Sequence, residues 1–147
     1  MSDIQYGLDT SVAVPLLMNT HGAHEQVAHW AQGRKLGLCG HALAETYSVL
    51  TRLPGANRLD STDAAMLIND SFTMCWMIPT ELAHRVHDEL SQLGISGGVT
   101  YDGLVALAAR ENNIVLVTRD ARALSTYEAC GVRLEVLTKT VLPRNPT

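Results

Sequence analysis

The feature that most constrains the fold is a run of four apolar residues at 114–117, Ile-Val-Leu-Val. The run is too short for a helix, is rich in β-branched residues and is apolar on both faces, which is typical of a parallel strand covered on both sides. It follows residues 104–109, whose apolar positions fit one face of a helix, and two asparagines that tolerate a helix end. We therefore predict helix, short turn and buried strand, with Asp102 at the beginning of this unit and Asp120 just past its end.

The length of 147 residues predicts one domain over the whole chain, with a loose tail at about 138–147. A content of 46% hydrophobic and 18% charged residues is that of an ordinary folded protein. The first residues lack a basic segment followed by an apolar run, and no stretch of about 20 apolar residues is present to cross a bilayer. We therefore expect no membrane association and a cytoplasmic location.

The three cysteines, Cys39, Cys75 and Cys130, are an odd number without a C-x-x-C pair, and apolar or small residues flank each of them. This usage predicts buried, reduced thiols rather than a redox or zinc site.

The net charge of −4 comes from 15 acidic and 11 basic residues. An acidic protein is a poor general binder of nucleic acid, because Lys and Arg supply most non-specific affinity for phosphates. However, four carboxylates in one metal site would leave 11 acidic residues against 11 basic ones, and bound divalent metal would reverse the sign of that site. The overall charge therefore does not exclude a polyanionic substrate.

The rest of the chain alternates short apolar runs with helical patterns. We predict strands at 4–8, 36–39, 74–78, 114–117 and 132–137, and helices beginning after Ser11 and at Asp102, with others at 24–32, 41–53, 62–72, 81–93 and 121–129. This order predicts an α/β fold, a single-domain three-layer α/β/α sandwich with a parallel sheet of four to five strands.

Four carboxylates stand at defined places in this pattern. Asp9 follows the first strand, Asp102 begins a helix and Asp120 follows a central strand, while Glu45 lies beside the apolar stripe of its helix. If the first strand neighbours residues 114–117, Asp9 and Asp120 face the same crevice at the carboxyl edge of the sheet. Two alternatives stay open: Asp9 is simply a helix N-cap, and Glu45 reaches solvent from the edge of the stripe.

Crowded carboxylates repel one another, and the chain has no matched set of Lys or Arg at these positions. Hard divalent cations resolve that conflict, because Mg²⁺ and Mn²⁺ prefer carboxylate oxygens and water. The pattern therefore favours a site for Mg²⁺ or Mn²⁺.

Four segments together resemble the PIN-domain ribonucleases and, within them, the VapC-type toxins of toxin–antitoxin pairs. They are 8–11 (Leu-Asp-Thr-Ser), 44–54 (AETYSVLTRLP), 101–108 (YDGLVALA) and 117–120 (Val-Thr-Arg-Asp), in the family's order and spacing. The sequence departs from the family at Gly103, a costly residue in a helix, where the family commonly has Ala or another helix former.

The resemblance implies a PIN-like fold and an endoribonuclease that depends on Mg²⁺ or Mn²⁺ and uses metal-activated water. It implies that Asp9 and Asp102 are the main metal ligands and that Glu45 and Asp120 complete the acidic pocket. It also places the hydroxyl of Thr118 in the pocket, with Ser11 as a weaker candidate. Arg119 and Arg122 would meet the RNA backbone or lie on the solvated surface.

The implied partners are an RNA substrate and a cognate antitoxin, which could place an Arg among the carboxylates, with operator DNA bound only through the antitoxin. A homodimer is also expected. Apolar residues at Tyr47, Leu50, Met66 and Leu67 exceed what one sheet face needs, so they form either an interface or ordinary core.

Other functions fit the sequence less well. An inactive PIN-like binding module would keep the fold without its chemistry, but it would have no reason to keep four unpaired acids. A phosphoryl-transfer domain of the haloacid-dehalogenase type needs a second Asp two residues after the nucleophile, where this chain has Ser11. A receiver domain needs an acidic pair near the first strand and a Lys after a late strand, and both are missing here. Zinc at the His21/His24 or His84/His87 pairs lacks a third ligand in the sequence.

Overall fold

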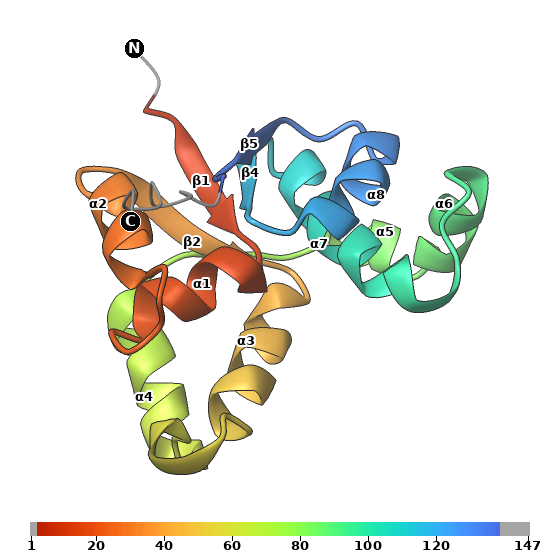
Figure 1. Ribbon diagram of the computed structural model, residues 1–147. Coiled ribbons are helices and arrows are strands. Elements are labelled where there is room, and N and C mark those ends of the chain that lie inside the picture. The colour runs from red at the N-terminus through yellow and green to blue at the C-terminus, as the bar shows by residue number, and fades with distance from the viewer. Residues whose placement is uncertain (1–2, 139–147) are drawn as a thin grey trace, which may run out of the picture.

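The computed structural model describes residues 3–138, and Figure 1 shows its strands between two groups of helices. The predicted tail lies outside the described residues except for Thr138. Five strands form one sheet in which every pairing is parallel, in the order β3-β2-β1-β4-β5. They are β1 (Gln5–Leu8), β2 (Lys35–Cys39), β3 (Cys75–Trp76), β4 (Val115–Thr118) and β5 (Leu134–Val136). The predicted parallel sheet is confirmed, with β1 at its centre.

Helices cover both faces of the sheet, so the three-layer arrangement is confirmed. The α-helices are α1 (Thr10–Leu17), α2 (His24–Ala31), α3 (Ala42–Thr51), α4 (Ser61–Ser71), α5 (Thr80–Ala83), α6 (Val86–Gln92), α7 (Thr100–Glu111) and α8 (Leu124–Ala129). Short 3-10 turns occur at η1 (Gly55–Asn57), η2 (Gly97–Val99) and η3 (Ala121–Ala123). No helix within residues 3–138 is long and apolar enough to cross a membrane.

Two hydrophobic cores lie on opposite faces of the sheet. Successive side chains of a strand point to opposite faces, and Leu116 accordingly packs with α7 and α8 while Val117 packs with α1, α2 and α4. The predicted burial of this strand on both faces is therefore confirmed. The helix before it ends as predicted, because α7 stops at Glu111 and Asn113 adopts a φ of 54°.

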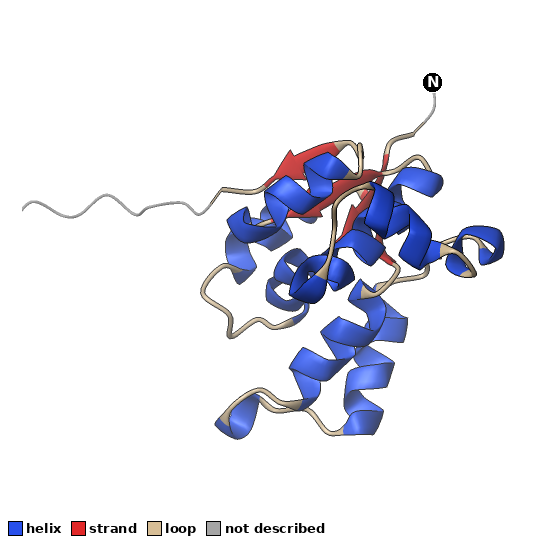
Figure 2. Ribbon diagram, turned by 90° about the vertical axis from the view of Figure 1, so that its right-hand side faces the viewer, coloured by secondary structure: helices blue, strands red, loops and turns tan. Residues whose placement is uncertain are grey.

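Helices α3 and α4 form a hairpin that extends past the sheet, at the bottom of both ribbon views (Figures 1 and 2). Leu50 of α3 and Ile68 of α4 hold this hairpin to the core, since both are buried. The start of α3 instead reaches the other core through Ala42. Helix α3 thus begins above the carboxyl edge of the sheet, where Glu45 lies in its first turn.

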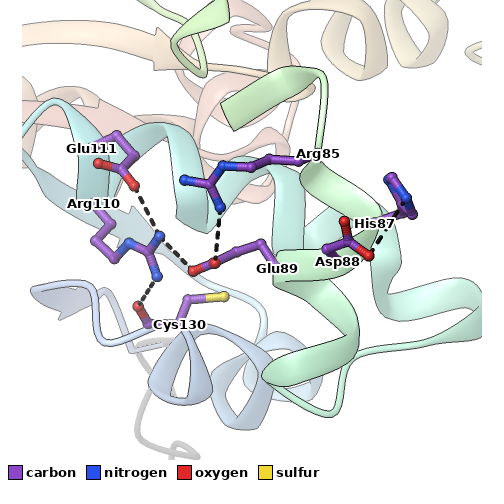
Figure 3. A network of polar contacts seen from close by, with 7 residues as sticks. All are labelled: Arg85, His87, Asp88, Glu89, Arg110, Glu111 and Cys130. Carbon is purple, nitrogen blue, oxygen red and sulfur yellow. Dashed lines mark hydrogen bonds and ion pairs between the residues drawn. The ribbon is translucent and has the colours of Figure 1, made fainter. Parts of the chain in front are cut away.

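The predicted single helix at 81–93 is wrong, because the structure has two short helices there. The four-residue repeat of Leu82, Val86 and Leu90 suggested one continuous helix, but Arg85 leaves helical geometry with a φ of −126° and a ψ of 22°. The break turns α6 toward α7, where Arg110 donates to Glu89 at 2.9 Å and to the carbonyl of Cys130 at 3.4 Å (Figure 3). Tertiary packing therefore decides this boundary.

The close approach of α6 also accounts for the glycine in α7. A Cβ at Gly103 would lie 2.7 Å from Cδ2 of Leu90 and 3.3 Å from Cγ2 of Ile95. The missing side chain thus lets α6 and the segment after it pack against the first turn of α7.

The prediction of three buried cysteines is wrong for Cys75. Cys39 and Cys130 are buried, but Cys75 lies exposed on the edge strand β3, where Trp76 is the buried residue. Successive side chains of a strand point to opposite faces of the sheet, so Trp76 faces the core while Cys75 faces the solvent. Within residues 3–138, all three cysteines are free thiols.

We predict that Gly7→Ala destabilises the fold by about 1–3 kcal/mol, the usual cost of overpacking a core. Gly7 lies in the central strand β1. A methyl group there would overlap Sγ of Cys39 and lie 2.6 Å from Cδ1 of Ile114. Urea unfolding would measure the loss. Gly22→Ala is the control, because a Cβ there meets nothing within 4 Å, and equal stability of the two variants would contradict the prediction.

Candidate active site

The candidate site lies at the carboxyl edge of the parallel sheet, between the two helical layers. Asp9 directly follows β1, and Asp120 follows the neighbouring strand β4. Asp102 lies in the first turn of α7 and Glu45 in the first turn of α3. Ligands of parallel α/β sheets bind at this edge, outside the ends of the strands.

Asp9 is the most deeply buried of the four carboxylates, with 4% of its surface exposed. Its Oδ1 accepts from Oγ of Ser11 at 2.5 Å, and its Oδ2 accepts from the hydroxyl of Tyr127 at 2.8 Å. It occupies the N-cap position of α1, but its side chain makes no capping hydrogen bond there. Burial raises the pKa of Asp9, and the hydrogen bonds from Ser11, Thr118 and Tyr127 offset part of that rise.

Hydroxyl groups connect Asp9 to the end of β4. The oxygens of Ser11 and Thr118 are 3.3 Å apart, and the backbone N–H of Asp120 donates to Oγ1 of Thr118 at 3.0 Å. The backbone N–H of Arg119 donates to Oγ of Ser11 at 2.8 Å. Ser11 and the fully buried Thr118 thus fix the turn that carries Asp120 against the turn that carries Asp9.

Asp102 and Glu45 are partly buried and come from the two helices on either side of this turn. The pKa of Asp102 is raised, mainly by burial and then by the negative charges of Glu45, Asp120 and Asp9. Asp102 therefore lies within electrostatic range of the other three carboxylates. None of the four forms an ion pair in the part of the chain that the structure describes.

The four carboxylates do not form a complete metal-binding site by themselves. Within residues 3–138, no three Asp, Glu, His or Cys side chains lie close enough together to hold a metal ion. The structure thus brings Asp9, Ser11, Thr118 and Asp120 into one hydrogen-bonded unit, while Glu45 and Asp102 face it through their charge.

Tyr127 is the residue of this site that the sequence did not reveal. Its side chain is 1% exposed and its hydroxyl donates to Asp9, 118 positions earlier in the chain. Burial, and then the charge of Asp9 and the hydrogen bond to it, raise its pKa, so the phenol stays protonated and remains a donor. The only signal was an aromatic residue in the helix after Asp120, and the contact itself depends on how α8 packs.

The arginines beside the site differ from each other. Arg119 is half-buried and its Nη1 donates to the carbonyl of Ser11 at 3.4 Å, whereas Arg122 is exposed. The backbone N–H of Arg122 donates to Asp120 at 3.0 Å, which holds that carboxylate at the start of η3. Arg119 is therefore built into the wall of the site rather than being a solvated surface charge.

The two histidine pairs make local contacts, such as His87 with Asp88 (Figure 3), and form no metal site within residues 3–138. Nδ1 of His21 accepts from the backbone of Ala23 at 3.0 Å, and Nδ1 of His24 lies 2.8 Å from the carbonyl of Pro15. Both contacts stabilise the turn between α1 and α2. His84 and His87 are exposed, and no described residue joins them as a further metal ligand.

Comparison with known proteins agrees with this geometry. The model of the family described as PIN domain matches residues 6–129. The chain is 51% identical over 129 residues to ribonuclease VapC27 of Mycobacterium tuberculosis, covering 88% of this chain and 94% of that protein. It is 37% identical over 131 residues to ribonuclease VapC40 of the same species, covering 88% and 97%.

Among solved structures, VapBC2 from Rickettsia felis, bound to a DNA fragment from its promoter, superposes with a TM-score of 0.61. That match covers 91% of this chain and 99% of the other, at 17% identity, and so supports the fold alone. The extent of the family match and the identity to both relatives show that the chain belongs to the PIN-domain family.

We predict that Tyr127→Phe lowers the free energy of unfolding by about 1.5–3 kcal/mol, the usual contribution of a hydrogen bond to a charged group. The variant keeps the ring that fills the core and removes only the donor to Asp9. Chemical denaturation in the presence of a chelator would measure the loss. Tyr47→Phe, at an exposed tyrosine of α3, is the control, and an unchanged Tyr127→Phe would show that the bond contributes nothing to stability.

We also predict that Asp102→Asn unfolds at a higher temperature than the wild type at pH 7 in a chelator. The pKa of Asp102 is higher in the folded protein than its ordinary value of 3.8, so the fold loses stability as the pH rises above about 3.8 and this carboxyl ionises. The neutral side chain of asparagine does not ionise and so avoids this loss of stability. The advantage of the variant should shrink as the pH falls toward 4.

Thermal unfolding between pH 4 and pH 7 would check this prediction. Asp70→Asn, at an exposed carboxylate of α4, is the matched control. An Asp102→Asn protein that melts no higher than the wild type at pH 7 would be incompatible with repulsion at this site.

Proposed function

We propose that this protein is the toxin of a toxin–antitoxin pair and acts as a metal-dependent endoribonuclease on RNA phosphodiester bonds. The observation that carries the proposal is the group of four carboxylates, without ion-pair partners in residues 3–138, at the ligand-binding edge of a PIN-domain sheet. Identity of 51% to a protein named ribonuclease VapC27 supports the same activity.

The donor set fits Mg²⁺ or Mn²⁺. All four groups are hard oxygen donors, and their mutual repulsion at Asp102 is the conflict that a divalent cation relieves. The lack of a three-residue cage within residues 3–138 is compatible with Mg²⁺, which usually keeps several waters and binds through one or two carboxylates together with substrate phosphates. We assign the main ligand roles to Asp9 and Asp102, with Glu45 and Asp120 acting directly or through water.

When bound, such a cation supplies a water of lowered pKa and offsets negative charge on the reacting phosphate. The protein's own residues orient this site. Ser11 and Tyr127 each hold one oxygen of Asp9, so that carboxylate cannot rotate freely. Thr118 holds the backbone that presents Asp120. Asp102 and Glu45 come to the same site from the first turns of α7 and α3.

An antitoxin is the protein partner that we propose for this toxin. Solved relatives of the same fold are named as VapBC complexes bound to DNA, and we propose that this chain likewise meets operator DNA only through its antitoxin. A cavity of about 340 Å³ lies between α3 and α4, with Tyr47, Ile68 and Met77 among its lining residues. We propose this cavity as part of an antitoxin or homodimer surface.

The apolar residues suggested for that surface divide into two kinds. Tyr47 and Met66 are exposed and available for an interface, whereas Leu50 is fully buried core and Leu67 is partly buried. A cytoplasmic location follows from the RNA substrate that we propose. The alternative of an inactive PIN-like module predicts the same fold and differs only in activity.

Purified, antitoxin-free protein should cleave total RNA at discrete sites with Mg²⁺ or Mn²⁺ and should not cleave it with chelator. Asp9→Asn and Asp102→Asn should each lower the rate by at least about 100-fold, the usual loss when one transition-state stabiliser is removed. Asp70→Asn is the control, because it removes an exposed carboxylate away from the site. Gel analysis of the RNA would measure the rates.

Activity that survives in both site variants would contradict the assignment of the ligands. Folded wild-type protein that cleaves no RNA with either metal would favour the inactive module. A rise in melting temperature with Mn²⁺ in the wild type, absent in Asp9→Asn, would test metal binding apart from cleavage.

A further inference from the structure

An aromatic pair stands at the rim of the candidate active site. The rings of His41 and Tyr101 are stacked, with centroids 4.8 Å apart and planes inclined by 26°. Tyr101 remains 54% exposed, and His41 is partly buried beneath this contact. A large aromatic ring is thus held in a fixed orientation while much of its surface stays in water.

The pair is joined to the two helices that carry the outer carboxylates. Tyr101 directly precedes Asp102 in α7. His41 is the N-cap of α3, and its carbonyl accepts from the backbone N–H of Glu45 at 3.1 Å. Residues four apart on a helix lie on the same side, so His41 and Glu45 are neighbours on α3. The stacked rings therefore join the beginnings of α3 and α7, the two turns that carry Glu45 and Asp102.

The packing and polar contacts of the fold do not explain why this pair is partly exposed. Neither ring belongs to the two hydrophobic cores, and within residues 3–138 neither side chain takes part in a hydrogen bond or an ion pair. An exposed aromatic face next to a site for phosphodiesters is what recognition of single-stranded RNA requires, because unpaired bases stack on Tyr and His rings.

We propose that Tyr101, supported by His41, is a stacking platform for an unpaired nucleobase next to the phosphate held at the carboxylates. This inference rests on the proposed function and adds a subsite to it. Stacking on the exposed ring would keep the RNA strand unpaired and set its register, so that one phosphate faces Asp9 and Asp102. Every base has an aromatic face, so this subsite selects single strands rather than a sequence.

The first test measures RNA binding separately from cleavage. Fluorescein-labelled oligoadenylate and oligouridylate would be titrated with the full chain in Ca²⁺, a hard cation for the carboxylates, with gels to confirm intact RNA. Tyr101→Ala should weaken binding by about 5- to 150-fold, the range for loss of one base-aromatic stack, whereas Tyr101→Phe keeps the ring and should bind like the wild type. His41→Ala should weaken binding less, because it removes only the support.

Tyr47→Ala is the matched control, since Tyr47 is an exposed tyrosine of α3 that lines the separate cavity toward α4. Melting temperatures of all variants would exclude a general loss of fold. Equal affinity of Tyr101→Ala and the wild type would overturn the proposal. So would a change in self-association of Tyr101→Ala with unchanged affinity for RNA, because the ring would then belong to a protein interface.

The second test locates the stacked base. Abasic nucleotides would be placed one at a time on either side of the cleavage site found with total RNA, and kcat/KM measured for the wild type and Tyr101→Ala. At one position the abasic substitution should slow the wild type and leave Tyr101→Ala unaffected, since both changes remove the same stack. Additive effects at every position would contradict the platform.

These outcomes separate the platform from the nuclease. Cleavage that needs Asp102 but is indifferent to Tyr101 overturns the platform and leaves the nuclease intact. Binding that depends on Tyr101 in a protein that cleaves no RNA supports the platform and overturns the nuclease.

Discussion

The structure depends on how one carboxylate, that of Asp9, is held at the end of the central strand. Burial of an ion is costly unless its oxygens are hydrogen-bonded, and here a serine from the following helix and a tyrosine from α8 each bind one of them. Those two donors come from opposite layers of the sandwich. The hydrogen bonds that offset the cost of burying Asp9 therefore also connect both helical layers to the centre of the sheet.

The carboxylates of the acidic pocket lower the stability of the fold, because they are partly buried and repel one another. Asp102 lies near Glu45, Asp120 and Asp9 without a described ion-pair partner, and its pKa is raised first by burial and then by the charges of these three carboxylates. A fold selected for stability alone would pair or remove these charges. The divalent cation that we propose would relieve this repulsion, and its positive charge would let a chain with a net charge of −4 act on a polyanion.

Much of the architecture and the four acids followed from the sequence, because those features are local. The buried strand at 114–117, the helix end at Asn113 and the alternation of strands and helices are set by side-chain periodicity and turn chemistry. Where periodicity continued through a break, as between Leu82 and Leu90, the prediction failed. The exposure of Cys75 was also missed, since an edge strand and a central strand can carry similar apolar residues.

The sequence by itself determined which residues are chemically able to act, and in which order they come along the chain. Only the tertiary structure decided which of them meet. Tyr127 reaches Asp9 because α8 packs against α7 in the same helical layer, and His41 reaches Tyr101 because α3 and α7 both begin at the same edge of the sheet. Periodicity records which face of an element is buried, but contacts between distant elements depend on strand order and helix packing, which no local pattern contains.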